Sequence, residues 1–165
     1  MGRIADNVRL AYPIVLSGLG LSIVQFFDTL MVGQVNKESL AAVAFASAII
    51  IIFLVFGQGM GMAQTPLVGQ AFARKETKRV AIIFQNAILQ NTLVGVFIVL
   101  ALLILLPFLP YLGQDAEVIK FAKPYFIATA LSLLPAQIFL AFRHFMEGVG
   151  NTKITMIIII SANIL

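Results

Sequence analysis

Four long apolar runs dominate this chain of 165 residues, at about residues 10–35, 39–73, 80–106 and 121–142. A helix needs roughly 20 apolar residues to cross the hydrocarbon core of a bilayer, and each run reaches that length. Transmembrane β-barrels instead show alternating segments of about 10 residues, whereas these runs are longer and do not alternate. The sequence therefore predicts an all-α fold, a polytopic bundle of transmembrane helices.

A fifth apolar run begins near residue 154 and reaches residue 165 after about 12 residues, which is too short to cross a bilayer. We therefore expect four complete spans plus part of a fifth, in a fragment of a longer protein. The composition agrees with a lipid environment, because 61% of the residues are hydrophobic and only 11% are charged. Soluble domains carry about 25% charged residues. We expect no soluble domain within residues 1–165.

Residues that carry enzymatic or metal chemistry are scarce. The chain has no cysteine and a single histidine, His144, which excludes zinc-thiolate, iron–sulfur and histidine-rich metal sites. It contains no nucleotide-binding loop and no nucleophile motif. Its net charge of +4 comes from short clusters between the apolar runs, which argues against a nucleic-acid partner. We expect no enzyme activity, no cofactor and no metal centre.

The basic residues alternate between the two sides of the predicted bundle. Eight of the 11 lie before the first run, between the second and third, or after the fourth: Arg3, Arg9, Arg74, Lys75, Lys78, Arg79, Arg143 and Lys153. The other three, Lys37, Lys120 and Lys123, fall on the opposite side. Because basic loops remain in the cytoplasm, we expect an integral protein of the plasma (inner) membrane with its N-terminus in the cytoplasm.

Asp28 is the only charged residue between residues 10 and 35. An aspartate at the centre of a membrane helix costs about 2.5–3.5 kcal/mol on insertion scales. Val35 lies seven positions further along the chain, roughly 10 Å of helix rise, which is too far for this short side chain to reach the interface. Intramembrane acids usually mark ion or substrate pathways. We therefore expect Asp28 to exchange a proton, a sodium ion or a cationic substrate; the alternative is a structural hydrogen bond between helices.

The residues around Asp28 divide the first helix into two faces. At about 100° per residue, Asp28 shares a sector with polar or small residues, namely Ser17, Gly18, Ser22, Gln25 and Thr29. The opposite face carries Leu16, Leu19, Ile23, Phe27 and Leu30. We expect the apolar face to contact lipid or other helices, and the polar face to line a cavity.

Four other features of the sequence bear on how the helices pack and where they meet the membrane surface. Gly57 and Gly61 form a GxxxG pair, which favours close approach of two helices. Pro13 permits a kink in the first span, although membrane helices tolerate proline in general. Tyr125 is either an interfacial residue or a cavity hydroxyl. His144 is expected at the membrane interface.

Several motifs resemble the multidrug and toxic compound extrusion (MATE) family. The first span, "LAYPIVLSGLGLSIVQFFDTLMVGQV", is similar to the first helix of that family, with its "LA-x-P" opening and "F-x-D-T-x-M-x-G" ending. "ESLAAVAFAS" and "GMAQTPLVGQAFARK" resemble the start and close of helix two. "FRHFMEGVGNTKITM" resembles the turn from helix four to helix five. The resemblance covers essentially the whole chain.

The resemblance implies a twelve-helix antiporter of two six-helix lobes that exports organic cations or drugs against inward proton or sodium flow. Residues 1–165 would form part of the N-terminal lobe and would need the remaining polypeptide, including the C-terminal lobe, as a partner. Asp28 would couple to the cation, with sodium as one candidate ion, and Pro13 would bend helix one. Tyr125 and Asn163 would contribute to a polar site in this lobe, and the polar face of the first helix would add Gln25 and Thr29.

Three other functions remain open at this point. A lipid-linked saccharide flippase of the same superfamily would have a similar architecture, but an acidic cavity favours cations. A small four-helix multidrug exporter acting as a dimer would not need a fifth helix. A membrane scaffold without transport activity would give the polar face around Asp28 no purpose beyond packing.

Overall fold

The computed structural model describes the backbone of residues 2–164 and the side chains of residues 12, 15–16, 18–20, 22–27 and 29–161. The elements in chain order are α1 (Gly2–Val35), α2 (Lys37–Met62), α3 (Gln64–Ala73), α4 (Thr77–Leu105), the 3₁₀ helix η1 (Leu106–Leu112), α5 (Ala116–Gly148) and α6 (Thr152–Ile164). No strand occurs within residues 2–164, so the all-α prediction is confirmed.

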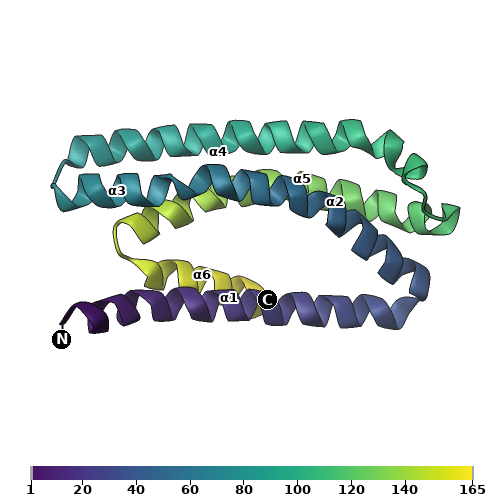
Figure 1. Cartoon of the computed structure of the whole chain (residues 1–165), viewed down its shortest axis with the longest axis horizontal. Helices are drawn as coiled ribbons and strands as arrows, with labels where there is room; N and C mark the ends of the chain where they lie inside the picture. Colours follow the sequence, from purple (N-terminus) through teal and green to yellow (C-terminus); the bar gives the residue numbers. More distant parts are fainter. Residues whose placement is uncertain (1, 165) are drawn as a thin grey trace.

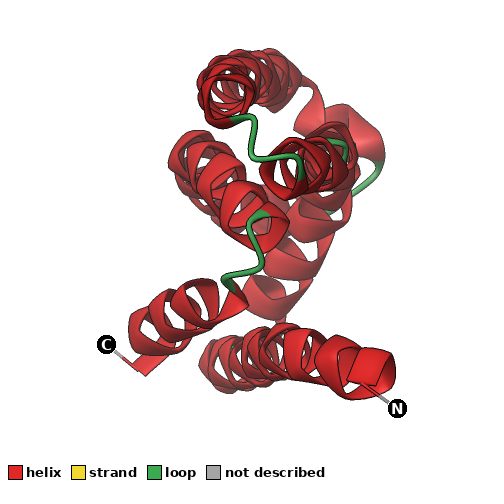
Figure 2. Cartoon of the chain, turned by 90° about the vertical axis from the view of Figure 1, so that its left-hand side faces the viewer, coloured by secondary structure: helices red, strands yellow, loops and turns green. Residues whose placement is uncertain are grey.

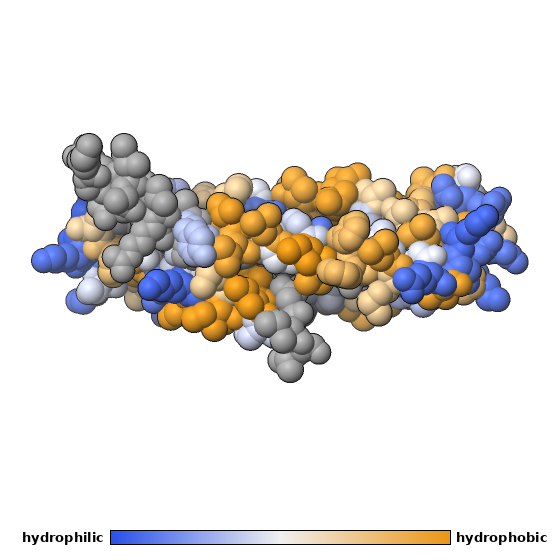
Figure 3. Space-filling model, turned by 90° about the horizontal axis from the view of Figure 1, so that it is seen from below, coloured by the Kyte–Doolittle hydropathy of each residue, from blue (hydrophilic) through white to orange (hydrophobic). Residues whose placement is uncertain are grey.

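Four segments of the described chain are long and apolar enough to cross a membrane. They are Gly18–Val35, Lys37–Ala73, Thr77–Leu112 and Ala116–Gly148. Their middle portions present large hydrophobic side chains to the outside, and Figure 3 shows an apolar band between two hydrophilic ends. Such a surface is stable against lipid. The predicted four spans are confirmed.

The second span is two helices rather than one. α2 ends at Met62 and α3 begins at Gln64, with Ala63 between them. Pro66 lies in the first turn of α3, and its nitrogen carries no hydrogen to donate to the carbonyl of Met62 four positions earlier. This long apolar run therefore contains a break near its end.

The helices form two groups joined by α2. α4 and α5 pack along one another, and α3 packs on both of them. α1 packs instead on α2 and α6, and Figures 1 and 2 show α1 and α6 together on one side of the molecule. The turns α3–α4 and α5–α6 lie at the same end as the start of α1 (Figure 1). The predicted grouping of the basic loops at one end therefore agrees with the fold.

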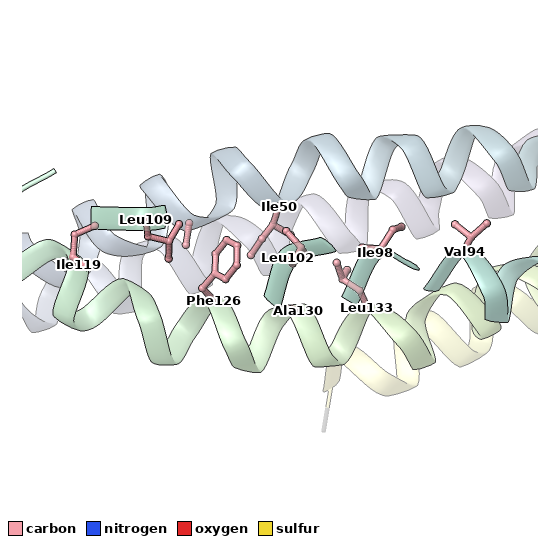
Figure 4. Packing of buried hydrophobic residues seen from close by; sticks show 10 residues of the cluster. Ile50, Val94, Ile98, Leu102, Leu109, Ile119, Phe126, Ala130 and Leu133 are labelled. Atoms are coloured by element: carbon pink, nitrogen blue, oxygen red, sulfur yellow. The ribbon is translucent and has the colours of Figure 1, made fainter. Parts of the chain in front are cut away.

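The main core lies where α2, α4 and α5 meet. Phe126, Ile98 and Leu102 are fully buried there, and Leu109 from η1 closes one end (Figure 4). A buried residue such as Phe126 gains dispersion contacts from every side. This core fixes α5 relative to α2, and both helices contribute to the pocket described below.

Two glycines of α2 allow α5 to approach closely. A Cβ at Gly57 would overlap the side-chain amide of Gln137, and one at Gly61 would lie 3.0 Å from the Cδ2 atom of His144. Both glycines are buried. The prediction of close helix approach at the GxxxG pair is confirmed, because side chains from α5 occupy the space above these two residues.

Candidate functional site

A pocket of about 600 Å³ lies between α1, α2 and α5. We call it the central pocket, and it is lined by Gln25, Thr29, Met31, Val32, Val43, Ser47, Ile51 and Tyr125. α1 packs on α2 and α6, whereas α5 packs on α2 from another side, so a space remains between α1 and α5. The pocket therefore follows from the way α2 joins the two groups of helices.

The polar groups of the central pocket come from three helices that are far apart in the sequence. Gln25 and Thr29 lie one turn apart on α1, Ser47 lies on α2, and Tyr125 lies on α5. The hydroxyl oxygens of Ser47 and Tyr125 are 3.3 Å apart, which is within hydrogen-bonding distance. Three predicted site residues, Gln25, Thr29 and Tyr125, are thus brought together, with Tyr125 as a cavity hydroxyl.

The hydroxyl group of Thr29 has its proton engaged within α1. Its Oγ1 donates a hydrogen bond of 2.8 Å to the carbonyl oxygen of Gln25. A hydroxyl group offers one donor and two acceptor sites, so the remaining capacity of Thr29 is to accept. Thr29 and Tyr125 line the same pocket, so its surface includes an acceptor oxygen and an aromatic ring, both of them neutral groups.

The other predicted site residues cannot be placed in the same way. The side chains of Asp28, Pro13 and Asn163 lie outside the described residues. Their backbone positions fall in α1 for the first two and in α6 for the third. Their proposed roles therefore stay predictions from the sequence.

The opposite face of α1 is exposed at four of its described residues, whereas Leu16 is half-buried. Leu19, Ile23, Phe27 and Leu30 have exposed fractions between 46% and 57%. This is the apolar face predicted to meet lipid or other helices, while Gln25 and Thr29 line the central pocket. Gln25 and Thr29 are themselves exposed, so the division of the first span into two faces stays a prediction.

Sequence reasoning missed Ser47. It is a single hydroxyl residue in the apolar segment "AFASAII", and one serine in a membrane helix is a weak signal because it can bond to its own helix. Only the position of Tyr125 on α5, 78 residues away, shows that Ser47 belongs to the pocket.

A second group of polar residues lies between α3 and the end of α5. We call Thr65, Arg143, His144 and Glu147 the α3–α5 polar cluster. Arg143 Nε donates to Glu147 Oε1 at 2.8 Å, and His144 Nδ1 lies 3.5 Å from Glu147 Oε2. Thr65 Oγ1 lies 3.3 Å from the same imidazole nitrogen. His144 is only 8% exposed and packs above Gly61, so its side chain is buried between helices near the end of the fourth span; its expected level at the membrane interface stays a prediction.

Metal chemistry finds no support in the part of the chain that the structure describes. No group of three or more histidine, cysteine, aspartate or glutamate side chains is arranged there to hold a metal ion. The charged members of the α3–α5 polar cluster instead satisfy one another. The described residues that line the central pocket are all neutral, and their polar groups are hydroxyl groups and an amide.

Comparison with known proteins gives one family. The MatE family model matches residues 13–165. The chain is 32% identical over 149 residues to a "Probable multidrug resistance protein NorM" of Oceanobacillus iheyensis, a match covering 90% of this chain and 33% of that protein. It is 27% identical over 161 residues to the protein of the same description from Bacillus subtilis, covering 97% of this chain and 36% of that one. The chain thus spans about a third of the length of these relatives.

Two solved structures share the fold. One is a MOP superfamily transporter from Pyrococcus furiosus, described as having a binding pocket of reverse polarity, with a TM-score of 0.90 and 16% identity. The other is an outward-facing multidrug resistance MATE family transporter of the MOP superfamily, with a TM-score of 0.87 and 16% identity. Each match covers 97% of this chain and 36% of the solved one.

Proposed function

The chain belongs to the MatE family, whose members are transporters rather than enzymes, and from this premise we propose that the complete protein is a secondary antiporter. It exports organic cations or drugs in exchange for protons or sodium ions. The exchange takes place in the inner membrane, with the N-terminus in the cytoplasm and with a C-terminal lobe that completes the pathway. Two observations support the proposal: the chain has four helical segments that can cross a membrane, and it is similar to probable multidrug resistance proteins.

The observation that carries the proposal is the central pocket. It gathers Gln25, Thr29 and Tyr125, three residues expected from the sequence alone to share a polar site with Asp28. Its described lining is neutral and combines acceptor oxygens, an aromatic ring and apolar side chains. Such a lining suits organic cations that carry large apolar groups. A single carboxylate near such a lining can hold either a coupling ion or a cationic substrate, and competition between the two is the basis of antiport.

Two alternatives are less well supported. A scaffold without transport activity has no need for a pocket of about 600 Å³ that is lined by hydroxyl groups from three helices. A lipid-linked saccharide flippase would need to bind an anionic linkage, whereas the described lining of the central pocket contains no basic residue.

The test is ethidium efflux from cells or vesicles that hold the complete protein, under an imposed proton or sodium gradient. We expect Asp28→Asn to abolish gradient-driven efflux and Asp28→Glu to retain part of it. Asp115→Asn serves as the matched control, because Asp115 is exposed and precedes α5 outside the predicted spans. Normal efflux by a folded Asp28→Asn variant would overturn the coupling role. Absence of any cation efflux by the wild type under both gradients would favour the flippase.

A further inference from the structure

A second pocket lies at the end of the molecule where the α3–α4 turn and the end of α5 meet. We call it the turn pocket; it measures about 570 Å³ and is lined by Phe72, Ala73, Lys75, Glu76, Thr77, Val80, Phe145 and Val149. Sites for small organic ligands usually have about 300–1,000 Å³. The turn pocket is therefore large enough for part of a lipid-sized molecule, and it is separate from the central pocket.

The surface of the turn pocket is almost entirely apolar, although three polar residues are among its lining residues. Lys75, Glu76 and Thr77 belong to the turn and to the first residue of α4, whereas Phe72 and Val80 lie further along the two helices. Phe145 continues the apolar surface, and its ring centre lies 4.3 Å from that of Phe84 on α4. An occupant with an apolar portion inside the pocket and a charged head beside the exposed basic residues of the turn would match this arrangement.

The level of the turn pocket relative to the apolar spans is also informative. Three of the spans meet this end: Lys37–Ala73 ends there, Thr77–Leu112 begins there, and Ala116–Gly148 ends there. Figure 2 looks onto this end and shows the α3–α4 and α5–α6 turns toward the viewer. The ends of transmembrane spans lie at the headgroup region of the bilayer, so the basic turn beside the pocket lies at headgroup level.

The turn carries an excess of positive charge. Arg74, Lys75, Lys78 and Arg79 surround one acid, Glu76. Among the side chains that the structure describes, the ion pair in this turn is that of Arg79 with Glu76, at 3.1 Å. The other three basic residues are exposed and remain available to an anion. Basic clusters at the membrane surface attract anionic lipid headgroups.

We propose that the turn pocket binds an anionic phospholipid. The phosphate group lies by Lys75, within reach of the charges of Arg74 and Lys78, and one acyl chain packs against Phe72, Val80 and Phe145. Charge complementarity selects this occupant over a zwitterionic lipid, and the apolar surface selects it over a free phosphate ion. The proposal goes beyond the proposed transport function and does not depend on which cation is exported or which ion drives export.

The test is native mass spectrometry of the complete protein in detergent, titrated with phosphatidylglycerol or phosphatidylethanolamine of matched acyl chains. We expect several-fold tighter retention of phosphatidylglycerol. The double variant Lys75→Gln/Lys78→Gln should weaken retention by about fivefold for each charge removed. The matched control Lys120→Gln/Lys123→Gln removes the same charge at the opposite end of the molecule and should leave retention unchanged.

A second variant tests the pocket rather than the charge. Ala73→Leu places a larger side chain within the lining and should weaken retention of both lipids while keeping the basic residues. A photoreactive acyl chain on phosphatidylglycerol should label residues 72–80 and 145–149, which makes the test independent of how Ala73→Leu folds. Equal retention of the two lipids, equal effects of the two double variants, or labelling confined to other segments would each overturn the proposal. Occupation of the turn pocket by another part of the polypeptide or by a second copy of the protein, in place of lipid, would overturn it as well.

Discussion

The hydroxyl groups of Ser47 and Tyr125 lie 3.3 Å apart across the contact between α2 and α5, at the wall of the central pocket. Both residues are half-buried, so each hydroxyl group loses some hydrogen bonds to water. The hydrogen bond between the two hydroxyl groups replaces part of that loss. Burying a hydroxyl group without a partner costs free energy. The pair therefore holds the ring of Tyr125 in a defined position relative to α2.

We expect Tyr125→Phe and Ser47→Ala each to weaken cation binding without abolishing gradient-driven export, because neither residue carries the exchanged charge. A net hydrogen bond contributes about 0.5–1.5 kcal/mol, so the KM for export should rise about fivefold. The double variant should lose less than the sum of the two single losses, because the residues are in contact. The measurement is the concentration dependence of ethidium efflux.

The control for this pair is Tyr111→Phe. Tyr111 lies in η1 and is 85% exposed, so the loss of its hydroxyl group should leave the KM unchanged. Strictly additive losses for Ser47 and Tyr125 would show that the two hydroxyl groups act separately.

Two arginine–glutamate ion pairs predict different effects on stability. Arg143 and Glu147 have side-chain exposures of 25% and 15%, whereas Arg79 and Glu76 have 61% and 35%. Glu147→Gln should lower the free energy of unfolding by about 1–3 kcal/mol, because Arg143 loses a charge-assisted bond and His144 loses a neighbour. Glu76→Gln should cost about 0–1 kcal/mol, as exposed pairs do.

These two variants control for each other, since each removes one negative charge from an acid at the same end of the molecule. Thermal unfolding of the purified complete protein in detergent gives the comparison. Equal shifts in the unfolding midpoint would contradict the view that the α3–α5 polar cluster contributes to stability through its burial.

Some features could be predicted from the sequence because they depend on local patterns. The apolar runs predicted the spans, and the spacing of Gly57 and Gly61 predicted the close approach of α5. The polar sector of α1 predicted Gln25 and Thr29 as lining residues. Each of these signals lies within one helix and follows from helical periodicity.

Other features depend on how separate helices meet, and no local pattern contains that information. Ser47 belongs to the central pocket only because α5 brings Tyr125 beside it. His144 is buried only because Gly61 on α2 leaves room for its ring. The break at Ala63 had a local signal in Pro66, but membrane helices often continue through proline, so the sequence did not distinguish a break from a kink.

The contact between Gly148 and α3 predicts a strong effect of a single methyl group, because the atoms it would meet are close to the backbone of α3. A Cβ at Gly148 would lie 2.7 Å from the Cβ of Val68 and 2.9 Å from the carbonyl oxygen of Thr65, and neither atom can move without shifting α3. Gly148→Ala should therefore lower the free energy of unfolding by about 1–3 kcal/mol, as overpacking does. Gly59→Ala is the matched control, because a Cβ there meets nothing within 4 Å, and alanine favours the helix over glycine by about 0.5–1 kcal/mol. Thermal unfolding should thus show opposite signs for the two substitutions, and a stabilising Gly148→Ala would contradict the close packing of α3 on the end of α5.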